Sequence, residues 1–260
     1  MQPGKVFLIG AGPGDPELMT LRAVRFLAAA DVVVYDRLVS AEIMATIPGS
    51  VRQIPVGKSP GCHPVPQDSI SRLLADLATA GLTVARLKGG DPLIFGRGSE
   101  EAAYLAARGI AVEFAPGITA AQGAASATGI PLTHRGLASG VRFVTGHRQA
   151  GEALDLDWTR LADPGTTLVV YMGRAHIRQI ALRLMVEGLA GSTPVMAVAN
   201  ATTARETRLV SRLDRLVVDL RDWSAEGPVL FLIGRVVSLH SRDELIGPTV
   251  TQHLIPAANA

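Results

Sequence analysis

The stretch KVFLIGAGPGDP, residues 5–16, decides the fold class of this 260-residue chain. Its first half, Lys5–Gly10, is a continuous apolar run of the kind that forms a strand buried on both faces of a parallel sheet. Its second half, Gly10–Pro16, is a turn rich in glycine and proline, and a helical pattern follows it. Strand, tight turn and helix in this order are typical of an α/β domain, whose ligands bind beyond the carboxyl ends of the strands.

The same alternation continues through the first half of the chain. Further strands are expected at Asp31–Asp36, Thr83–Lys88 and Ala111–Pro116. Helices are expected between them, one with an apolar face of Leu18, Leu21, Val24 and Leu27, one with a face of Ile70, Leu73, Leu74 and Leu77, and one at Glu100–Arg108. This βαβα pattern predicts a mostly parallel sheet with helices on both faces.

A second set of strands follows the turn residues Pro116-Gly117-Ile118-Thr119. The expected strands are Val141–Gly146, Thr166–Gly173, Pro194–Asn200 and Pro228–Gly234, with a helix carrying Ile177, Ile180 and Leu184 on one face. Antiparallel pairs are expected in this set, because the last two strands are not joined by a clean crossover. We therefore expect an N-terminal α/β domain at 1–116, a C-terminal α/β domain at 117–245 and a loosely ordered tail at 246–260.

Composition excludes several classes of protein. Hydrophobic residues make up 48% of the chain and aromatic residues only 4%, which predicts aliphatic cores. The formal net charge of +2 does not favour a nucleic-acid-binding protein. The single cysteine, Cys62, excludes an internal disulfide and cannot by itself form a zinc site. No apolar targeting segment or long apolar run is present, so we expect a cytoplasmic protein that does not enter a membrane.

The turn after the first strand does not fit a dinucleotide site. A G-x-G-x-x-G pattern would use Gly10 and Gly12, but Asp15 occupies the third glycine position and would repel a phosphate. The alternative is a structural turn in which Asp15 caps a helix that begins at Pro16, and we expect that role.

The next candidate runs from Arg86 to Glu101 and contains Gly89, Gly90 and Asp91 at the end of a strand. Glycines there let a ligand approach the backbone closely, and an aspartate suits ribose hydroxyls or a cation better than a phosphate. Arg97 lies in a glycine-flanked loop. The alternative interpretation is that Asp91 and Ser99 cap a helix and that Arg97 pairs with Glu101 on the surface.

The third candidate runs from Gly129 to Gly136 and leads to Thr145-Gly146-His147-Arg148. His134 and His147 are read as ordinary loop residues. Basic residues are the stronger signal, because arginine binds carboxylates in a bidentate manner and several basic residues would together suit a polyanionic substrate. The candidates for such a basic cleft are Lys58, Arg86, Lys88, Arg97, Arg135 and Arg148.

Other catalytic patterns are missing from the sequence. It has no phosphate-binding G-x-x-x-x-G-K-[ST] loop, no C-x-x-C pair and no G-x-S-x-G nucleophile elbow. Metal catalysis and covalent catalysis therefore have no basis in the sequence, and no metal site is expected.

Several long motifs, in this order, resemble those of the tetrapyrrole methylase family. They are Val6–Leu18, Asp31–Val39, Arg86–Glu101, Ala115–Ala121, Gly129–Arg135, Thr145–His147, Tyr171–Gly173 and Asn200–Thr202. The resemblance extends from about Val6 to about Leu239. One departure is Ser99, where the family usually has a second glycine after the arginine, and it matters only if that position needs a positive φ.

The resemblance implies the fold of a class III methyltransferase, with two α/β domains and the active site in the cleft between them, and a homodimer. It implies S-adenosylmethionine as co-substrate, S-adenosylhomocysteine as product and a small-molecule tetrapyrrole as partner. The implied reaction is two successive methylations, at C2 and C7 of uroporphyrinogen III, giving precorrin-2 by way of precorrin-1. Cobalamin, sirohaem and haem d1 biosynthesis all use that product.

Site residues follow from the resemblance by matching position. The implied cofactor contacts are Pro13, Gly89, Gly90, Asp91, Ile94, Thr119, Ala120, Met172, Ala201 and Val229. Asp36 and Lys58 match a proton acceptor and a proton donor, and Arg97 matches a residue tied to both substrate binding and proton removal. We favour an electrostatic role for Arg97, because a guanidinium stays protonated at ordinary pH. The implied substrate contacts are Arg97, Glu100, Arg135 and Met172.

Three alternatives remain open at this point. The nearest is a precorrin methyltransferase of the same family that acts at another ring position. A nicotinamide-dependent oxidoreductase is disfavoured by Asp15, and a non-catalytic tetrapyrrole carrier would not need the second ligand site that the Asp91 loop suggests. No dehydrogenase or ferrochelatase module is recognised, so we expect the enzyme to act without one.

Overall fold

The computed structural model describes residues 4–57, 66–147 and 154–240 of the chain. The chain divides into two compact units, Met1–Gly123 and Ala124–Ala260. Each unit contains one five-stranded sheet with helices, which confirms the predicted class of two α/β domains. The domain boundary expected at residue 116 lies in the loop before helix α5 (Ala120–Thr128) and stays a prediction. The expected tail at 246–260 lies outside the described residues.

The sheet of the first unit is entirely parallel. Its strands are β1 (Lys5–Gly10), β2 (Val32–Tyr35), β3 (Arg52–Pro55), β4 (Val84–Lys88) and β5 (Ala111–Ala115). They lie in the order β3-β2-β4-β1-β5, with β4 between β2 and β1. The carboxyl ends of all five strands therefore meet at one edge, where ligands of open α/β sheets bind.

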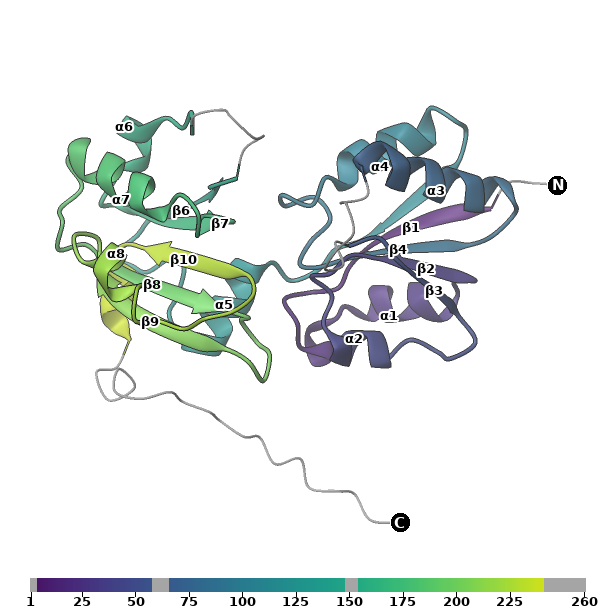
Figure 1. Cartoon of the computed structure of the whole chain (residues 1–260), viewed down its shortest axis with the longest axis horizontal. Helices are drawn as coiled ribbons and strands as arrows, with labels where there is room; N and C mark the ends of the chain where they lie inside the picture. The colour runs from purple at the N-terminus through teal and green to yellow at the C-terminus, as the bar shows by residue number, and fades with distance from the viewer. Residues whose placement is uncertain (1–3, 58–65, 148–153, 241–260) are drawn as a thin grey trace, which may run out of the picture. The chain divides into compact units, whose positions relative to one another are not determined.

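Helices cover both faces of this sheet, as the sequence predicts (Figure 1). One face carries α1 (Leu21–Ala28) and α2 (Ala41–Ala45), and the other carries α3 (Gln67–Thr79) and α4 (Gly98–Ala106). A short 3-10 turn, η1 (Pro16–Leu18), precedes α1, and its first amide is capped by Asp15, whose carboxylate accepts a hydrogen bond from Glu17. The predicted capping role of Asp15 is thus confirmed.

The predicted apolar face of α1 is wrong at Leu21 and Val24 and right at Leu27. Leu21 is 90% exposed and Val24 51% exposed, whereas the buried side chains are those of Ala23, Phe26 and Leu27. On a helix with about 3.6 residues per turn, a step of three residues rotates the side-chain direction by about 300°. Three such steps, or nine residues, therefore bring the series to the opposite side of the helix. The prediction for α3 follows the i, i+3, i+4, i+7 pattern instead, and its Ile70 and Leu74 are buried.

The sheet of the second unit is mixed, which confirms the expected antiparallel pairs. Its strands are β6 (Gly140–Thr145), β7 (Thr166–Tyr171), β8 (Pro194–Ala199), β9 (Thr207–Arg212) and β10 (Val229–Ile233), in the order β6-β7-β10-β8-β9. Only β6 and β7 are parallel to each other; β10 runs antiparallel to both β7 and β8, and β9 to β8.

One face of the second sheet packs against an aliphatic core. Three helices contribute to this core, namely α6 (Trp158–Leu161), α7 (Ile177–Val186) and α8 (Leu216–Asp219). The predicted face of α7 is confirmed, since Ile177, Ile180 and Leu184 are all buried. A 3-10 segment, η2 (Arg235–Leu239), follows β10.

Candidate functional site

Three glycine-containing loops meet at the carboxyl edge of the first sheet. Gly12, after β1, and Gly90, after β4, form an antiparallel bridge in which each amide donates to the other residue's carbonyl, at 3.2 and 2.7 Å. Gly117, after β5, lies so close that a Cβ on it would be 2.1 Å from the carbonyl oxygen of Gly90. A Cβ on Gly10 would lie 2.4 Å from the amide nitrogen of Gly117. Only glycine fits at these contacts, because real Cβ atoms do not approach backbone atoms this closely.

Asp91 ties two of these loops together. Its Oδ2 accepts a hydrogen bond from the amide of Gly117 at 3.1 Å, and its Oδ1 accepts one from the amide of Leu93 at 2.8 Å. Each carboxylate oxygen retains a free lone-pair direction after one such bond. Asp91 therefore fixes the loop that follows β4 and still has acceptor capacity for a ligand hydroxyl or cation.

The other residues predicted to contact a cofactor in the first unit lie on the same loops. Pro13 follows β1, Gly89 follows β4, and Ile94 lies a few residues further along the same loop. Thr119 precedes α5, and its hydroxyl accepts a hydrogen bond from the amide of Gln122, so that it caps this helix just before Ala120. The structure thus brings all the predicted cofactor contacts of the first unit to one edge of its sheet.

Arg97 and Glu100 form a bidentate ion pair at the start of α4. The Nε of Arg97 donates to Glu100 Oε1 at 3.0 Å and its Nη2 donates to Glu100 Oε2 at 2.6 Å, with the side chains 54% and 55% exposed. The hydrogen bond from Arg97 lowers the pKa of Glu100, and the same bond raises the pKa of Arg97. The surface partner of Arg97 is therefore Glu100 rather than Glu101, and an exposed pair of this kind can exchange Glu100 for a carboxylate of a ligand.

Asp36 follows β2 at the same edge of the first sheet. Its Oδ1 accepts a hydrogen bond from the amide of Leu38 at 3.1 Å, and its Oδ2 lies 3.6 Å from Nη2 of Arg86. Its side chain is a quarter exposed, so it is both anchored and accessible. Lys58, the predicted proton donor, lies outside the described residues, as does Arg148.

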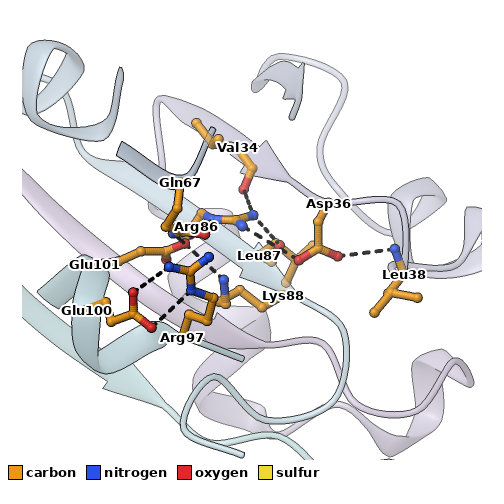
Figure 2. A network of polar contacts seen from close by, with 10 residues as sticks. All are labelled: Val34, Asp36, Leu38, Gln67, Arg86, Leu87, Lys88, Arg97, Glu100 and Glu101. Atoms are coloured by element: carbon orange, nitrogen blue, oxygen red, sulfur yellow. Dashed lines mark hydrogen bonds and ion pairs between the residues drawn. The ribbon is translucent and has the colours of Figure 1, made fainter. Parts of the chain in front are cut away.

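Arg86 and Lys88 do not belong to an open basic cleft, and this part of the sequence interpretation is wrong. They lie on β4 and are 2% and 4% exposed. Both donate to Oε1 of the fully buried Glu101 on α4, at 3.3 and 3.0 Å (Figure 2). Burial lowers the pKa of Lys88, and the neighbouring Arg86 lowers it further, while Glu101 acts in the opposite direction. A free basic cleft would need these cations at the surface.

Glu101 and Gln67 are the residues of this region that sequence reasoning missed. Gln67, the first residue of α3, donates through Nε2 to the same Oε1 of Glu101 at 2.8 Å. A signal was available, because Arg86 and Lys88 are two residues apart in a buried strand and so point to the same face. Buried cations require an anion, and the helix after that strand carries the adjacent acids Glu100 and Glu101.

The three predicted cofactor contacts of the second unit also gather at one end of a sheet. Met172 follows β7, Ala201 lies just after β8, and Val229 begins β10 directly opposite Ala199. The chain is tied there by Asn200, whose amide donates to the carbonyl of Pro228 and whose side chain donates to the carbonyl of Glu226. Met172 is 49% exposed, whereas Ala201 and Val229 are buried.

Left-handed backbone conformations mark the predicted positions in both units. Five residues other than glycine have positive φ among those described, and they are Phe95, Arg97, Met172, Asn200 and Thr202. Arg97 and Met172 are predicted site residues, Asn200 and Thr202 flank Ala201, and Phe95 follows Ile94. Such strained residues concentrate at functional sites, where the surrounding structure holds them in place. Ser99 lies within α4 and needs no positive φ, so its departure from the family pattern has no backbone consequence.

Arg135 lies at the other end of the second sheet. It lines an open pocket of about 600 Å³ together with Thr133, Gly136, Gly165 and Arg235, next to the first residues of β6 and β7. Met172 follows the last residue of β7, and five residue steps along a strand correspond to about 17 Å. Within this unit the structure therefore does not bring Arg135 together with Met172, and the role of Arg135 stays a prediction.

A parallel sheet whose loops meet backbone against backbone beside Asp91 is typical of α/β proteins, which bind their ligands at the carboxyl edge of the sheet. The chain matches the Tetrapyrrole (Corrin/Porphyrin) Methylases over residues 5–217 and belongs to that family. The predicted family is thereby confirmed, and this membership does not support a nicotinamide-dependent oxidoreductase.

Relatives of the chain carry consistent names. It is 57% identical over 236 residues to the uroporphyrinogen-III C-methyltransferase of Paracoccus denitrificans, a match that covers 91% of this chain and 82% of that protein. It is similar to a crystal structure of the uroporphyrin-III C-methyl transferase of Thermus thermophilus complexed with S-adenyl homocysteine, with 42% identity and a TM-score of 0.77 over 91% of this chain and 100% of that one.

A longer class of relative is also similar. The chain is 48% identical over 239 residues to the siroheme synthase of Methylococcus capsulatus, and the match covers 92% of this chain but only 50% of that protein. The chain thus spans about half the length of this relative. Within the described residues, every helix is too short or too polar to cross a membrane.

Proposed function

We propose that the chain is an S-adenosylmethionine-dependent C-methyltransferase that converts uroporphyrinogen III to precorrin-2 by way of precorrin-1, methylating C2 and C7. The observation that carries this proposal is the 57% identity to the Paracoccus enzyme over nearly the whole chain. The geometry supports it, because the residues that would hold the cofactor gather at one edge of each sheet.

The first-unit loops fit an adenosyl group with a sulfonium side chain. Gly10 and Gly117 leave no room for a Cβ, and Gly90 has a φ of +69° that favours glycine, so the three loops meet backbone against backbone at the edge where the ligand is proposed to bind. Asp91 offers its remaining lone pairs to ribose hydroxyls or to the cationic part of the ligand. Pro13, Gly89, Ile94, Thr119 and Ala120 are the other proposed cofactor contacts of the first unit, and Met172, Ala201 and Val229 are those of the second. S-adenosylmethionine supplies a methyl group that is already activated.

Arg97 is proposed to hold the substrate by its carboxylates. Uroporphyrinogen III carries carboxylates all round its rim, and a bidentate guanidinium recognises a carboxylate by geometry as well as by charge. Glu100 occupies the guanidinium fork and keeps it oriented, at half exposure, until a substrate carboxylate takes its place. Arg135 and Met172 are the further proposed substrate contacts.

Proton removal is assigned to Asp36 in this proposal. Carbon methylation of a reduced pyrrole leaves a proton that a base must take up, and a positioned carboxylate contributes roughly 10²–10⁴-fold in such steps. Asp36 is accessible and is anchored through Leu38 and Arg86. Lys58 is the proposed proton donor. Arg97 stays protonated and acts through its charge.

The test is a product assay. Purified protein is incubated with uroporphyrinogen III and S-adenosylmethionine, and the oxidised product is followed by fluorescence and mass after short and long times. We expect a singly methylated species first and a doubly methylated species later. Products that never carry a methyl group would contradict the proposal. A methylated product obtained only from a later precorrin would favour a methyltransferase acting at another ring position.

The remaining expectations are part of the same proposal. We propose that the protein acts as a homodimer in the cytoplasm and that precorrin-2 from it enters cobalamin, sirohaem or haem d1 biosynthesis. Sedimentation measurements would test the dimer. A protein that is monomeric at the assay concentration and retains full turnover would contradict the proposed homodimer.

A further inference from the structure

Glu101 is the centre of a buried polar network on the side of the first sheet that α3 and α4 cover. One of its oxygens, Oε1, accepts hydrogen bonds from Gln67, Arg86 and Lys88, at 2.8, 3.3 and 3.0 Å (Figure 2). These donors come from α3 and β4, while Glu101 comes from α4. The network therefore links three elements around a single carboxylate.

The formal charges of this network do not balance within it. Arg86 and Lys88 are two cations, and Glu101 is one anion; all three are nearly or fully buried. The next anion is Asp36, whose Oδ2 lies 3.6 Å from Nη2 of Arg86. Buried charges are stable only when they are paired and hydrogen-bonded. Asp36 is therefore the carboxylate that balances the second positive charge.

The guanidinium of Arg86 is held in one orientation by several acceptors. Its Nε donates to Glu101, and its Nη1 donates to the carbonyls of Val34 and Leu87, at 3.4 and 3.2 Å. A planar guanidinium fixed at Nε and Nη1 has no rotational freedom left for Nη2. That remaining nitrogen points to the Asp36 carboxylate (Figure 2).

Asp36 is thereby held from two sides. The amide of Leu38 donates to Oδ1, and Arg86 lies against Oδ2. The Leu38 bond belongs to the local turn after β2, whereas Arg86 comes from β4 and is backed by α4. A carboxylate that accepts a hydrogen bond at one oxygen and faces a fixed cation at the other is restricted in its orientation, which favours a fixed approach of a proton acceptor to its proton.

We propose that Arg86 is the positioning residue for Asp36, and that Glu101 keeps Arg86 in place for that task. The proposal rests on the proposed methyltransferase function and adds a residue to its proton-transfer step. Arg86 is buried, so it is not proposed to contact the substrate. Its effect on turnover passes through the Asp36 carboxylate.

A double-mutant cycle tests this proposal. Wild-type protein, Arg86→Gln, Asp36→Asn and the double variant are compared in single turnovers with uroporphyrinogen III at saturating S-adenosylmethionine. We expect Arg86→Gln to lower the rate about tenfold or more when Asp36 is present, because directly coupled residues show interaction energies of this order. In the Asp36→Asn background the same change is expected to have no further effect. The affinity for S-adenosylhomocysteine should stay the same in all four proteins.

Two additional variants keep the test decisive. Arg86→Lys retains a cation for Glu101 but loses the fork that reaches Asp36, so the same cycle can be run with it if Arg86→Gln does not fold. Arg108→Gln, an exposed arginine that bonds to Tyr104 on α4, is the matched control and should leave turnover unchanged. An equal rate loss from the Arg86 substitution in both backgrounds would overturn the proposal. A wild-type protein that does not turn over would overturn the proposed function itself, and this inference with it.

Discussion

Arg97 is the residue on which the proposed substrate site depends most. Replacing it with lysine keeps the charge but removes the bidentate fork that now holds Glu100. We expect Arg97→Lys to lose turnover roughly ten- to a hundredfold, the equivalent of a charged hydrogen bond, while S-adenosylmethionine binding is unchanged. Steady-state kinetics and calorimetry measure the two quantities. The control is Arg108→Lys, and full turnover of Arg97→Lys would remove Arg97 from the substrate site.

Asp91 belongs to the cofactor half of the proposed site. Both of its oxygens accept backbone hydrogen bonds. Asp91→Ala therefore removes the bonds to Leu93 and Gly117 that fix the loop after β4, and it also removes the proposed ligand acceptor. We expect the affinity for S-adenosylhomocysteine to fall about tenfold or more, as measured by calorimetry. Asp222→Ala, at an exposed position in the second unit, is the control. Unchanged affinity in Asp91→Ala would contradict a role of Asp91 in binding the cofactor.

The sequence could predict where single site residues lie in the fold, but not which residues they pair with. Arg97, Asp36 and Asp91 lie where the motifs place them, at the carboxyl edge of a parallel sheet. The motifs could not reveal that Arg86 and Lys88 pair with a buried glutamate, because the exposure of these two side chains depends on which face of the sheet α4 covers. Nor could they reveal the left-handed backbone at Arg97 and Met172, since this conformation is normally seen at glycine.

At the scale of elements, the close contact between the loops after β1, β4 and β5 makes a direct prediction. Gly117→Ala would put a Cβ 2.1 Å from the carbonyl of Gly90, so the two loops must separate. We expect lower thermal stability and weaker S-adenosylhomocysteine binding, because Pro13, Gly90 and Thr119 are positioned by the same loops. Thermal unfolding with and without the ligand measures both effects.

The control for this substitution is Gly49→Ala. A Cβ at that exposed position would meet nothing within 4 Å, and its φ is not in the left-handed region. We expect it to be neutral or slightly stabilising, since alanine restricts the unfolded chain. Equal behaviour of the two variants would contradict the tight meeting of the three loops.

Continuous apolar strands were the most predictable elements, and partly exposed edge strands the least. The predicted strand at Lys5–Gly10 has the bounds of β1, and the other expected strands lie within one or two residues of those observed. Strands β3 and β9 were missed. Both are edge strands, and much of their surface is exposed, so they lack the continuous apolar run that marks a central parallel strand.

For the molecule as a whole, Glu101 should matter for stability well beyond its neighbourhood. Glu101→Gln leaves Lys88 buried without its anionic partner and leaves Arg86 with Asp36 alone, and breaking a buried ion pair costs about 3–5 kcal/mol. We expect a clear drop in the free energy of unfolding, measured by urea titration at neutral pH. The matched control is Glu113→Gln, whose pair with Lys5 is about half exposed and should contribute no more than about 1 kcal/mol. Similar stabilities of the two variants would contradict a structural role for the buried network.

The two units contribute to the proposed function in different ways. The first, with its parallel sheet, carries Asp36, Asp91 and Arg97, and the second carries Met172 and Ala201 at one end of a mixed sheet. Periodicity predicted two α/β units, but only the family resemblance implied which residues of each unit serve a methyltransferase. Arg135 lies at the other end of the second sheet, so its implied role as a substrate contact stays a prediction.

Isotope labelling shows whether the protein transfers methyl groups to carbon atoms of a tetrapyrrole. Uroporphyrinogen III is incubated with the protein and S-adenosylmethionine carrying carbon-13 in its methyl group, and the product is examined by NMR. We expect two labelled methyl groups, bonded to the ring carbons C2 and C7. A product without label, or with the label only at other ring positions, would contradict the proposed function.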